Sequence, residues 1–275
     1  MNKGILYVST GKEFVDETIL SAKTVKQEMD VPITVASDES IESEFIDSTI
    51  KIDNPQYGFG DQIDIMKETP YDKTLYLDSD IYMCEGISDI FTALDHFDLV
   101  ASHAPVRSQD DNSDVQRPPP CFPEYNTGVV GYCLTDLMHT FLNRWAEEYE
   151  KDHQRGCNRN QPSFRQALYE SDIRIGTLPS EYNCRFQFPG QATGIVKVFH
   201  GRLREMNTNN GGAPHLMDIK SVANKINKKQ DPRVFYPRGN SVSVRGLSDS
   251  ILYRLQYSLK QHGVLKTMKQ LMRKL

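Results

Sequence analysis

Short apolar runs alternate with longer amphipathic segments along the first half of the chain. Residues 5–9 and 33–36 are continuous apolar runs of the kind that form buried strands, whereas apolar residues recur at helical spacing over residues 14–29. The apolar run at residues 74–77 continues the series. We therefore predict βαβ units and a mainly parallel sheet, whose strand ends meet along one edge.

The second half of the chain continues these patterns. Further strands are predicted at residues 98–102, 128–134, 173–178 and 195–199, and helices at residues 61–68, 136–150 and 161–171. A polar, proline-rich stretch at residues 105–124 interrupts them, and a loop of this length in a compact domain is typical of a lid or binding loop. The sequence thus predicts one α/β domain over residues 1–230, a Rossmann-like α/β/α sandwich around a mainly parallel twisted sheet.

Residues 231–275 differ in composition from the domain before them. Residues 231–248 contain prolines and glycines and read as a linker. Residues 249–275 place apolar side chains on one helical face and basic side chains on the other, and residues 245–275 carry a net charge of +6. Such a basic amphipathic helical tail is typical of a segment that lies on an anionic membrane surface. It fits equally a helix packed on its own domain or on a subunit partner.

The overall composition narrows the class of protein. The net charge of −5 does not favour a partner that is a nucleic acid, because such a protein usually has a broad basic surface. The five cysteines include no CxxC pair, so neither a disulfide framework nor a zinc site is predicted. No stretch approaches the ~20 apolar residues of a transmembrane helix, and the N-terminus lacks a signal-peptide core. We expect a cytoplasmic protein, peripheral at the inner face of the cell membrane if the tail binds lipid.

Two carboxylates at the end of a strand are the most informative residues. Asp78 and Asp80 directly follow the apolar run Leu75-Tyr76-Leu77. Acids at a strand end are common in turns, but side chains alternate along a strand, so these two can face one cation. Mg²⁺ and Mn²⁺ suit carboxylate ligands better than zinc does. Because open α/β sheets bind ligands at this edge, the pair predicts a divalent metal that holds a diphosphate.

Six segments, in order along the chain, carry a resemblance to a known family. They are Leu6-Tyr7-Val8-Ser9-Thr10, Val35-Ala36-Ser37-Asp38, Tyr76-Leu77-Asp78-Ser79-Asp80, Tyr125-Asn126-Thr127-Gly128-Val129-Val130, Asn160-Gln161-Pro162-Ser163-Phe164 and Phe199-His200-Gly201-Arg202. Over roughly residues 3–205 the chain resembles the GT-A glycosyltransferases, in particular the family 8-like group. This resemblance implies a GT-A fold and a metal-dependent transfer of a sugar from a nucleoside diphosphate, expected to be UDP, to an acceptor hydroxyl.

The resemblance also implies roles for individual residues. The metal, Mn²⁺ or Mg²⁺, would be held by Asp78, Asp80 and His200. The nucleotide would be contacted by Ser9, Thr10, Asp38, Ser79, Arg202 and Arg204. The donor sugar would be contacted by Asn126, Thr127, Gly128 and Gln161, and the catalytic candidates are Gln161, Asn160 and Asn126. The acceptor is expected to be a glycan or a lipid-linked molecule.

Two positions depart from the family pattern. The family usually has an acid before the glutamine, and Asn160 cannot act as a carboxylate base, which favours a retaining reaction; as a simple structural residue it would cap the following helix. A base for an inverting reaction would come from Asp110, Asp111, Asp114 or Glu124. Gln62 stands near a position where these enzymes often carry a basic donor-binding residue, for which Lys67 is a candidate substitute.

Two other functions are compatible with this kind of sheet. A sugar-phosphate nucleotidyltransferase would carry a glycine-rich, arginine-containing loop after the first strand, whereas Ser9-Thr10-Gly11-Lys12-Glu13 has one glycine and no arginine. A non-catalytic protein that binds nucleotide sugars or glycans on a GT-A scaffold would tolerate Asn160, although it would not need both Asp78 and Asp80.

Overall fold

The structure is a computed structural model that describes residues 2–107, 118–202, 217–228 and 231–246, together with residues 255, 258–260 and 263–264. In chain order the elements are β1 (Lys3–Val8), α1 (Lys12–Glu28), β2 (Ile33–Ser37), β3 (Ser48–Lys51), α2 (Phe59–Met66), β4 (Lys73–Leu77), β5 (Ile81–Met83), α3 (Ile90–Ala93), β6 (Leu99–His103), β7 (Tyr125–Cys133), α4 (Asp136–Gln154), α5 (Gln161–Tyr169), β8 (Ile175–Leu178), η1 (Ser180–Tyr182), β9 (Gly190–Ala192), β10 (Val198–His200), α6 (Ile219–Asn227), β11 (Arg233–Arg238) and β12 (Ser241–Gly246).

Seven strands form the main sheet in the spatial order β3-β2-β1-β4-β7-β6-β8. The β1–β2, β1–β4, β2–β3 and β6–β8 pairs are parallel, and only β7 runs antiparallel to both of its neighbours, β4 and β6. The predicted mainly parallel α/β sheet is therefore confirmed. The strands β1, β2 and β4 are adjacent and parallel, so Ser9, Asp38 and Asp78, which follow them, are brought to the same edge of the sheet.

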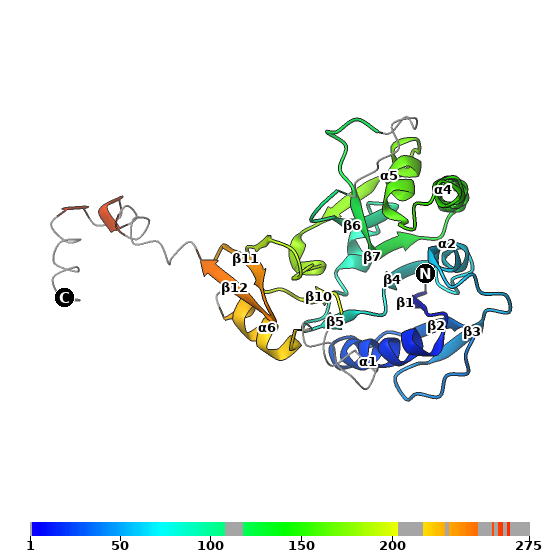
Figure 1. Ribbon diagram of the computed structural model, residues 1–275, viewed down its shortest axis with the longest axis horizontal. Helices are drawn as coiled ribbons and strands as arrows, with labels where there is room; N and C mark the ends of the chain where they lie inside the picture. The colour runs from blue at the N-terminus through cyan, green and yellow to red at the C-terminus, as the bar shows by residue number, and fades with distance from the viewer. Residues whose placement is uncertain are drawn as a thin grey trace.

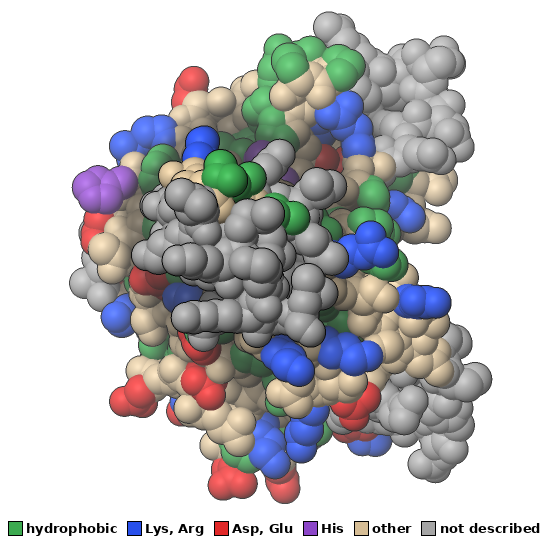
Figure 2. All heavy atoms as spheres, turned by 90° about the vertical axis from the view of Figure 1, so that its left-hand side faces the viewer, with side chains coloured by type: hydrophobic (Ala, Val, Ile, Leu, Met, Phe, Trp, Pro, Cys, Tyr) green, Lys and Arg blue, Asp and Glu red, His purple; other side chains and the backbone are tan. Residues whose placement is uncertain are grey.

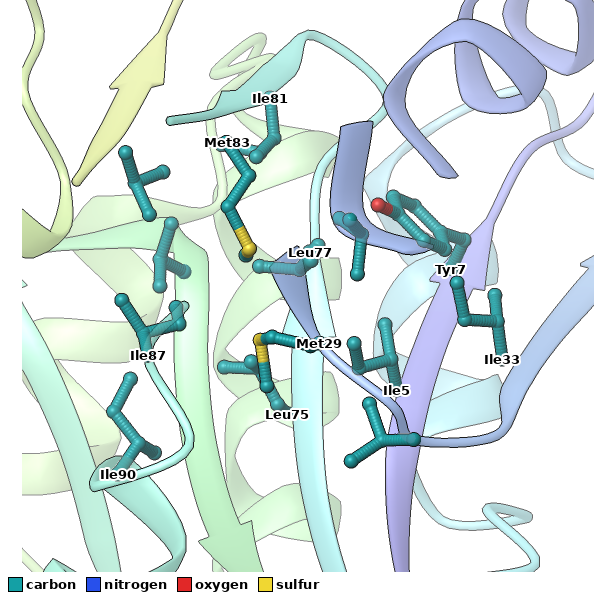
Figure 3. Close-up of a cluster of buried hydrophobic side chains, with 14 of the residues drawn as sticks. Ile5, Tyr7, Met29, Ile33, Leu75, Leu77, Ile81, Met83, Ile87 and Ile90 are labelled. Carbon is teal, nitrogen blue, oxygen red and sulfur yellow. The ribbon is translucent and has the colours of Figure 1, made fainter. Parts of the chain in front are cut away.

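Helices cover both faces of this sheet, which explains why its strands read as continuous apolar runs (Figure 1). One face packs against α1 and α3 through a cluster that includes Tyr7, Leu75 and Leu77 (Figure 3). The other face packs against α2, α4 and α5, and the fully buried Trp145 lies in that cluster. Alternate residues of each strand enter the two clusters, as the period of two in a strand requires.

A smaller unit lies beside the main sheet and joins it through a two-stranded connection. There β5 pairs antiparallel with β10, in a register that places His200 opposite Ile81. The strands β9, β11 and β12 form a three-stranded sheet, and α6 packs against it around Val222, Ile226 and Phe235 (Figure 1). This unit carries a hydrophobic core of its own.

The interpretation of residues 231–248 as a linker is wrong for residues 233–246, which form the antiparallel β11–β12 hairpin. The prolines and glycines of this segment belong to the hairpin and do not mark a linker. Gly239 adopts a φ of 57° in the two-residue turn between the strands, a backbone conformation that glycine tolerates and hairpin turns require. Pro237 lies beyond the three residues of β11 that pair with β9, so it removes no bond on that side.

Charges of both signs are interspersed over the described part of the surface shown in Figure 2, and that face has no broad basic field of the kind expected of a nucleic-acid-binding surface. Within the described residues, no helix combines the length and apolar character needed to cross a bilayer. The predicted amphipathic tail, residues 249–275, falls almost entirely outside the described residues, and its membrane-binding role stays a prediction.

Candidate functional site

Asp78, Asp80 and His200 converge at the edge of the sheet. Each offers a ligand atom, and these atoms all lie within 4.8 Å of one another. The Nε2 atom of His200 lies 3.3 Å from Asp80 Oδ1 and 3.5 Å from Asp78 Oδ2. Asp78 follows the last residue of β4, and the β5–β10 register places His200 opposite Ile81, the residue after Asp80. Two carboxylates and one imidazole form a donor set that fits a hard divalent cation such as Mn²⁺ or Mg²⁺.

Gly128 leaves the space that these side chains occupy. A Cβ atom built on Gly128 would lie 2.2 Å from His200 Cε1 and 2.5 Å from Asp78 Oδ2. The Gly128 carbonyl also accepts a hydrogen bond from the Asp78 backbone N–H at 2.9 Å. Glycine at this position therefore permits the close approach of two candidate metal ligands, whereas its predicted contact with the donor sugar stays a prediction.

Hydrogen bonds orient the candidate ligands. The Tyr76 hydroxyl donates to Asp78 Oδ1 at 2.9 Å. The His200 Nδ1 atom lies 2.8 Å from Asn183 Oδ1, and the Asn183 amide donates to Asn126 Oδ1 at 2.8 Å. Because an amide oxygen only accepts, His200 must carry a proton on Nδ1. In the neutral form its Nε2 lone pair is then directed toward Asp78 and Asp80, which is the form that coordinates a metal.

The charged neighbours of His200 act in opposite directions. Burial disfavours the imidazolium, but the charge of Asp80 and hydrogen bonds to Asp78 and Asp80 outweigh it and raise the pKa of His200. Burial also opposes ionisation of Asp80, yet His200, Arg185 and Arg202 together lower its pKa. Arg185 works against the imidazolium, since its Nη1 lies 3.0 Å from His200 Nε2 and can only donate. A proton and a divalent cation would compete for the same nitrogen, so metal affinity should fall as the pH falls.

Replacing Asn183 by alanine is expected to weaken Mn²⁺ binding by about 10- to 100-fold, because the acceptor that fixes the His200 tautomer is lost. Metal titration followed by the electron paramagnetic resonance of free Mn²⁺ would measure this. Asn183→Asp keeps an acceptor at the same place and should recover most of the affinity. An unchanged affinity in Asn183→Ala would mean that His200 does not need this orientation, or does not bind the metal.

The metal ligands line a pocket of about 380 Å³ that also has aromatic and cationic walls, to which Phe14, Tyr57 and Arg202 contribute. Arg202 is held in place by the buried carboxylate of Glu17, which accepts from Arg202 Nε at 2.7 Å and from the Ser79 hydroxyl at 2.8 Å. The Arg202 guanidinium lies 5.0 Å from the centre of the Phe14 ring.

Burial raises the pKa of Glu17 despite the opposing influence of Arg202. Burial of Arg202 works toward a lower pKa, but its hydrogen bond to Glu17 and the charges of Glu17 and Asp80 raise the pKa overall. The pair therefore keeps a cation at the wall of the pocket, beside the candidate metal ligands.

Some of the residues predicted to contact the nucleotide line the first pocket, and others do not. Thr10, Ser79 and Arg202 line the pocket, whereas Ser9 is buried and its hydroxyl is bonded to Thr18 at 2.5 Å. The Ser9 side chain is therefore turned away from the pocket into α1. Asp38 lies next to the pocket and accepts hydrogen bonds from the Gly11 N–H and the Tyr57 hydroxyl.

A second pocket, of about 230 Å³, adjoins the first and shares Phe59, Asp78 and Arg185 with it. Of the predicted donor-sugar and catalytic residues, Asn126, Thr127, Asn160 and Gln161 line it, whereas Gly128 lines neither pocket.

Asn160 belongs to a buried network next to the second pocket: it accepts from Thr127 Oγ1 at 3.1 Å and donates to Gln62 Oε1 at 2.9 Å. Its side chain makes no capping bond to α5. Lys67 was the candidate for the basic donor-binding role that Gln62 cannot fill. The structure does not support this role, because Lys67 pairs with Asp64 at 2.8 Å and lines neither pocket.

Five residues predicted to contact the nucleotide or to act as a base are not part of either pocket as described. Arg204 and the loop acids Asp110, Asp111 and Asp114 fall outside the described residues. Glu124 is described, is buried and directly precedes β7, but it does not line either pocket.

Three residues of the site escaped the sequence analysis. Glu17, Asn183 and Arg185 come from α1 and from the segment between η1 and β9, and nothing in the chain order connects them with Asp78. Glu17 offered one signal, because it shares a helical face of α1 with Ser21, four residues later, and that face is buried. An acid on a buried helical face needs a partner. Asn183 and Arg185 offered none beyond their position in an irregular segment before His200.

Comparisons with known proteins show which solved structures share this fold. No family model and no curated protein matches the sequence. Among solved structures, the glycosyltransferase GlyE of Streptococcus pneumoniae TIGR4 aligns with a TM-score of 0.51 and 17% identity, over 68% of this chain and 48% of GlyE. Its apo form aligns with a TM-score of 0.50 and 18% identity, over 68% and 47% of the two chains. The match thus spans about half the length of GlyE.

A third structure, the galactosyltransferase LgtC in complex with donor and acceptor sugar analogs, aligns with a TM-score of 0.49 and 14% identity over 66% of this chain and 74% of its own, which adds no weight to the assignment. The likeness to GlyE agrees with the mostly parallel sheet and its covering helices. The chain has the GT-A glycosyltransferase fold.

Proposed function

We propose that this protein is a metal-dependent glycosyltransferase that moves a sugar from a nucleoside-diphosphate donor, expected to be a UDP-sugar, to an acceptor hydroxyl. The observation that carries the proposal is the convergence of Asp78, Asp80 and His200 within 4.8 Å at the wall of a pocket. The fold, which is that of known glycosyltransferases, supports it. A bare nucleotide-sugar binding protein would not need so complete a set of metal ligands.

Asp78, Asp80 and His200 would hold Mn²⁺ or Mg²⁺, and such an ion neutralises the charge that grows on a leaving diphosphate. Arg202 stands at the same pocket, fixed by Glu17 and by the face of Phe14. Its guanidinium can donate two parallel hydrogen bonds to phosphate oxygens. The protein thereby supplies a preformed cationic wall on the side from which the diphosphate departs.

The nucleoside end of the donor is proposed to lie against Thr10, Phe14 and Tyr57. Phe14 and Tyr57 are 42% and 68% exposed, so aromatic surface beyond the Phe14 face that Arg202 covers is available for a base to stack on. The Tyr57 backbone has a φ of 55°, an uncommon conformation, and its N–H donates to Asp61 at 2.9 Å. Asp61 thus holds the loop that presents the Tyr57 ring.

The second pocket is proposed to receive the acceptor hydroxyl beside the anomeric carbon. Among the described residues that line it, Asp78 is the only carboxylate, and in this proposal Asp78 is committed to the metal. Gln161 and Asn126 offer amide groups that can orient sugar hydroxyls, but amides are not bases. An inverting reaction needs a base at the acceptor, so we propose that the reaction proceeds with retention of configuration.

The configuration of the product tests this directly. With an α-linked UDP-sugar and an accepted acceptor, proton NMR of the first product formed is expected to show an α-glycosidic linkage. A β-linkage would contradict retention and would direct attention to the acids of residues 108–117 as a source of base.

The activity itself is tested by release of UDP, with UDP-glucose, UDP-galactose and UDP-N-acetylglucosamine as donors and Mn²⁺ present. Slow UDP release without acceptor, abolished by a chelator and restored by Mn²⁺, is the expected result. Tight binding without release, over a broad range of acceptors, would identify a binding protein. Release of pyrophosphate from UTP and a sugar phosphate would identify a nucleotidyltransferase. We propose a glycan or a lipid-linked molecule as the acceptor, so the acceptors tested should include a lipid-linked sugar.

A further inference from the structure

The second pocket contains two arginines that the transfer reaction, as proposed, does not use. Arg159 and Arg185 line it from the segment before α5 and the segment before β9. Phe59 and Phe188 line it as well, so cationic and aromatic groups face the same space. This inference rests on the proposed function, because it concerns the substrate that would enter this pocket.

Neither arginine forms an ion pair within 4.0 Å with a described carboxylate, although Arg185 is close enough to Asp80 to help lower the pKa of Asp80. Two arginines elsewhere on the described surface do have acidic partners: Arg202 lies 2.7 Å from Glu17, and Arg174 lies 2.8 Å from Asp98. Arg159, in contrast, is exposed, and no described carboxylate lies within ion-pair distance of it. A cation beside a concave surface, without a counter-charge from the protein, favours an anionic ligand.

Arg185 lies at the junction of the two pockets, which it lines together with Asp78. Its Nη1 atom contacts His200, its guanidinium lies 5.7 Å from the centre of the Phe188 ring, and its buried Nε–H has no hydrogen-bond partner. A buried donor without an acceptor is destabilising. An anionic oxygen in the pocket would instead accept from the Nη groups of Arg185, and the ring of Phe188 holds the guanidinium in position.

The charge of the second pocket is therefore positive once the metal site is filled. Asp78 is the only described carboxylate on its wall, and its charge is offset by the cation that it would bind. The wall also includes Gln161, the first residue of the nine-residue helix α5, whose N-terminal end carries partial positive charge. Arg159, Arg185 and the helix terminus act in the same direction.

We propose that the acceptor is an acidic saccharide, with a phosphate or carboxylate group next to the sugar that receives the transfer. Its anionic group would lie between Arg159 and Arg185, where guanidinium groups can donate in pairs to phosphate or carboxylate oxygens. Its ring would pack against Phe59 and Phe188, as apolar sugar faces do on aromatic side chains. Arg159 lines only the second pocket, which makes it the residue that reports on the acceptor.

The experiment compares matched acceptors on the full chain with Mn²⁺ and the UDP-sugar that gives the fastest acceptor-free hydrolysis. The probes are glucose, glucose 6-phosphate and glucuronate, with the corresponding galactose compounds. Wild-type protein is expected to use an anionic probe with a kcat/KM at least tenfold above that of its neutral counterpart, since hydrogen bonds to charged groups are worth roughly that factor. The phosphate and carboxylate probes distinguish the two sources of anionic group.

Arg159→Gln should reduce the ratio of anionic to neutral kcat/KM by about tenfold, and Arg159→Lys should retain part of it. Arg155→Gln is the matched control, because Arg155 is paired with Asp152 and lies four residues earlier; its ratio should equal that of wild type. Equal use of neutral and anionic probes, use of neither, or an unchanged ratio in Arg159→Gln would overturn the inference. Absence of donor hydrolysis in wild type would instead overturn the proposed function.

Discussion

Replacing Asp80 by asparagine is expected to lower Mn²⁺-dependent UDP release by at least about 100-fold, because changes even in the groups around metal ligands lower affinity or activity by 10- to 100-fold. Asparagine has almost the same shape but no charge, so the donor set loses one of its two anions. Asp80 lies 3.3 Å from His200, and its backbone carbonyl, which accepts from the Gly201 N–H at 3.0 Å, stays intact. UDP release measured across a range of Mn²⁺ concentrations would show the loss.

The matched control for this change is Asp64→Asn. Asp64 lies on α2 with its side chain 53% exposed and forms a surface ion pair with Lys67. Surface pairs contribute little, so rate and stability should stay within about 0.5 kcal/mol of wild type. If Asp80→Asn kept the Mn²⁺ dependence of wild type, Asp80 would not be a metal ligand.

Replacing Gly128 by alanine is expected to weaken Mn²⁺ binding by more than about tenfold and to destabilise the fold by about 1–3 kcal/mol, the usual effect of overpacking. The added methyl group would lie 2.2 Å from His200 Cε1 and 2.5 Å from Asp78 Oδ2, and neither residue is free to move. Asp78 accepts from Tyr76, and His200 is bonded to Asn183. Titration with Mn²⁺ and unfolding in urea measure the two effects separately.

Gly194→Ala is the control for this substitution, because a Cβ atom at Gly194 has no neighbour within 4 Å and its φ lies outside the left-handed region. It should leave both Mn²⁺ affinity and stability near the wild-type values. A Gly128→Ala protein that is destabilised but binds Mn²⁺ with unchanged affinity would separate the packing role of Gly128 from the metal site and contradict the arrangement described above.

The sequence predicted those parts of the fold whose signal is local. Strands β1, β2 and β4 are buried on both faces, so their apolar runs were unambiguous. The three-residue strands β5, β9 and β10 are too short to produce a period. In the β11–β12 hairpin, Gly239-Asn240 between two strand-like runs was a readable turn signal, but the neighbouring prolines led to its interpretation as a linker.

The candidate site likewise contains residues that the sequence could predict and residues that it could not. Asp78 and Asp80 are separated by one residue in the sequence, and the resemblance added His200, so the donor set could be predicted before the fold was known. The residues that orient it could not. Asn183 and Arg185 reach His200 only because η1 and the segment after it fold back beside β10, and Glu17 reaches Arg202 across a separation of 185 residues. Such contacts depend on tertiary placement, which no spacing in the chain encodes.

The central claim is that Asp78, Asp80 and His200 together bind the metal that holds the donor diphosphate. Anomalous diffraction from crystals grown with Mn²⁺ and UDP tests it most directly. We expect one strong peak within about 2.1 Å of a carboxylate oxygen from each aspartate and of His200 Nε2, with the diphosphate completing the coordination. Bound UDP without a peak at these residues, or a peak at other residues only, would contradict the claim.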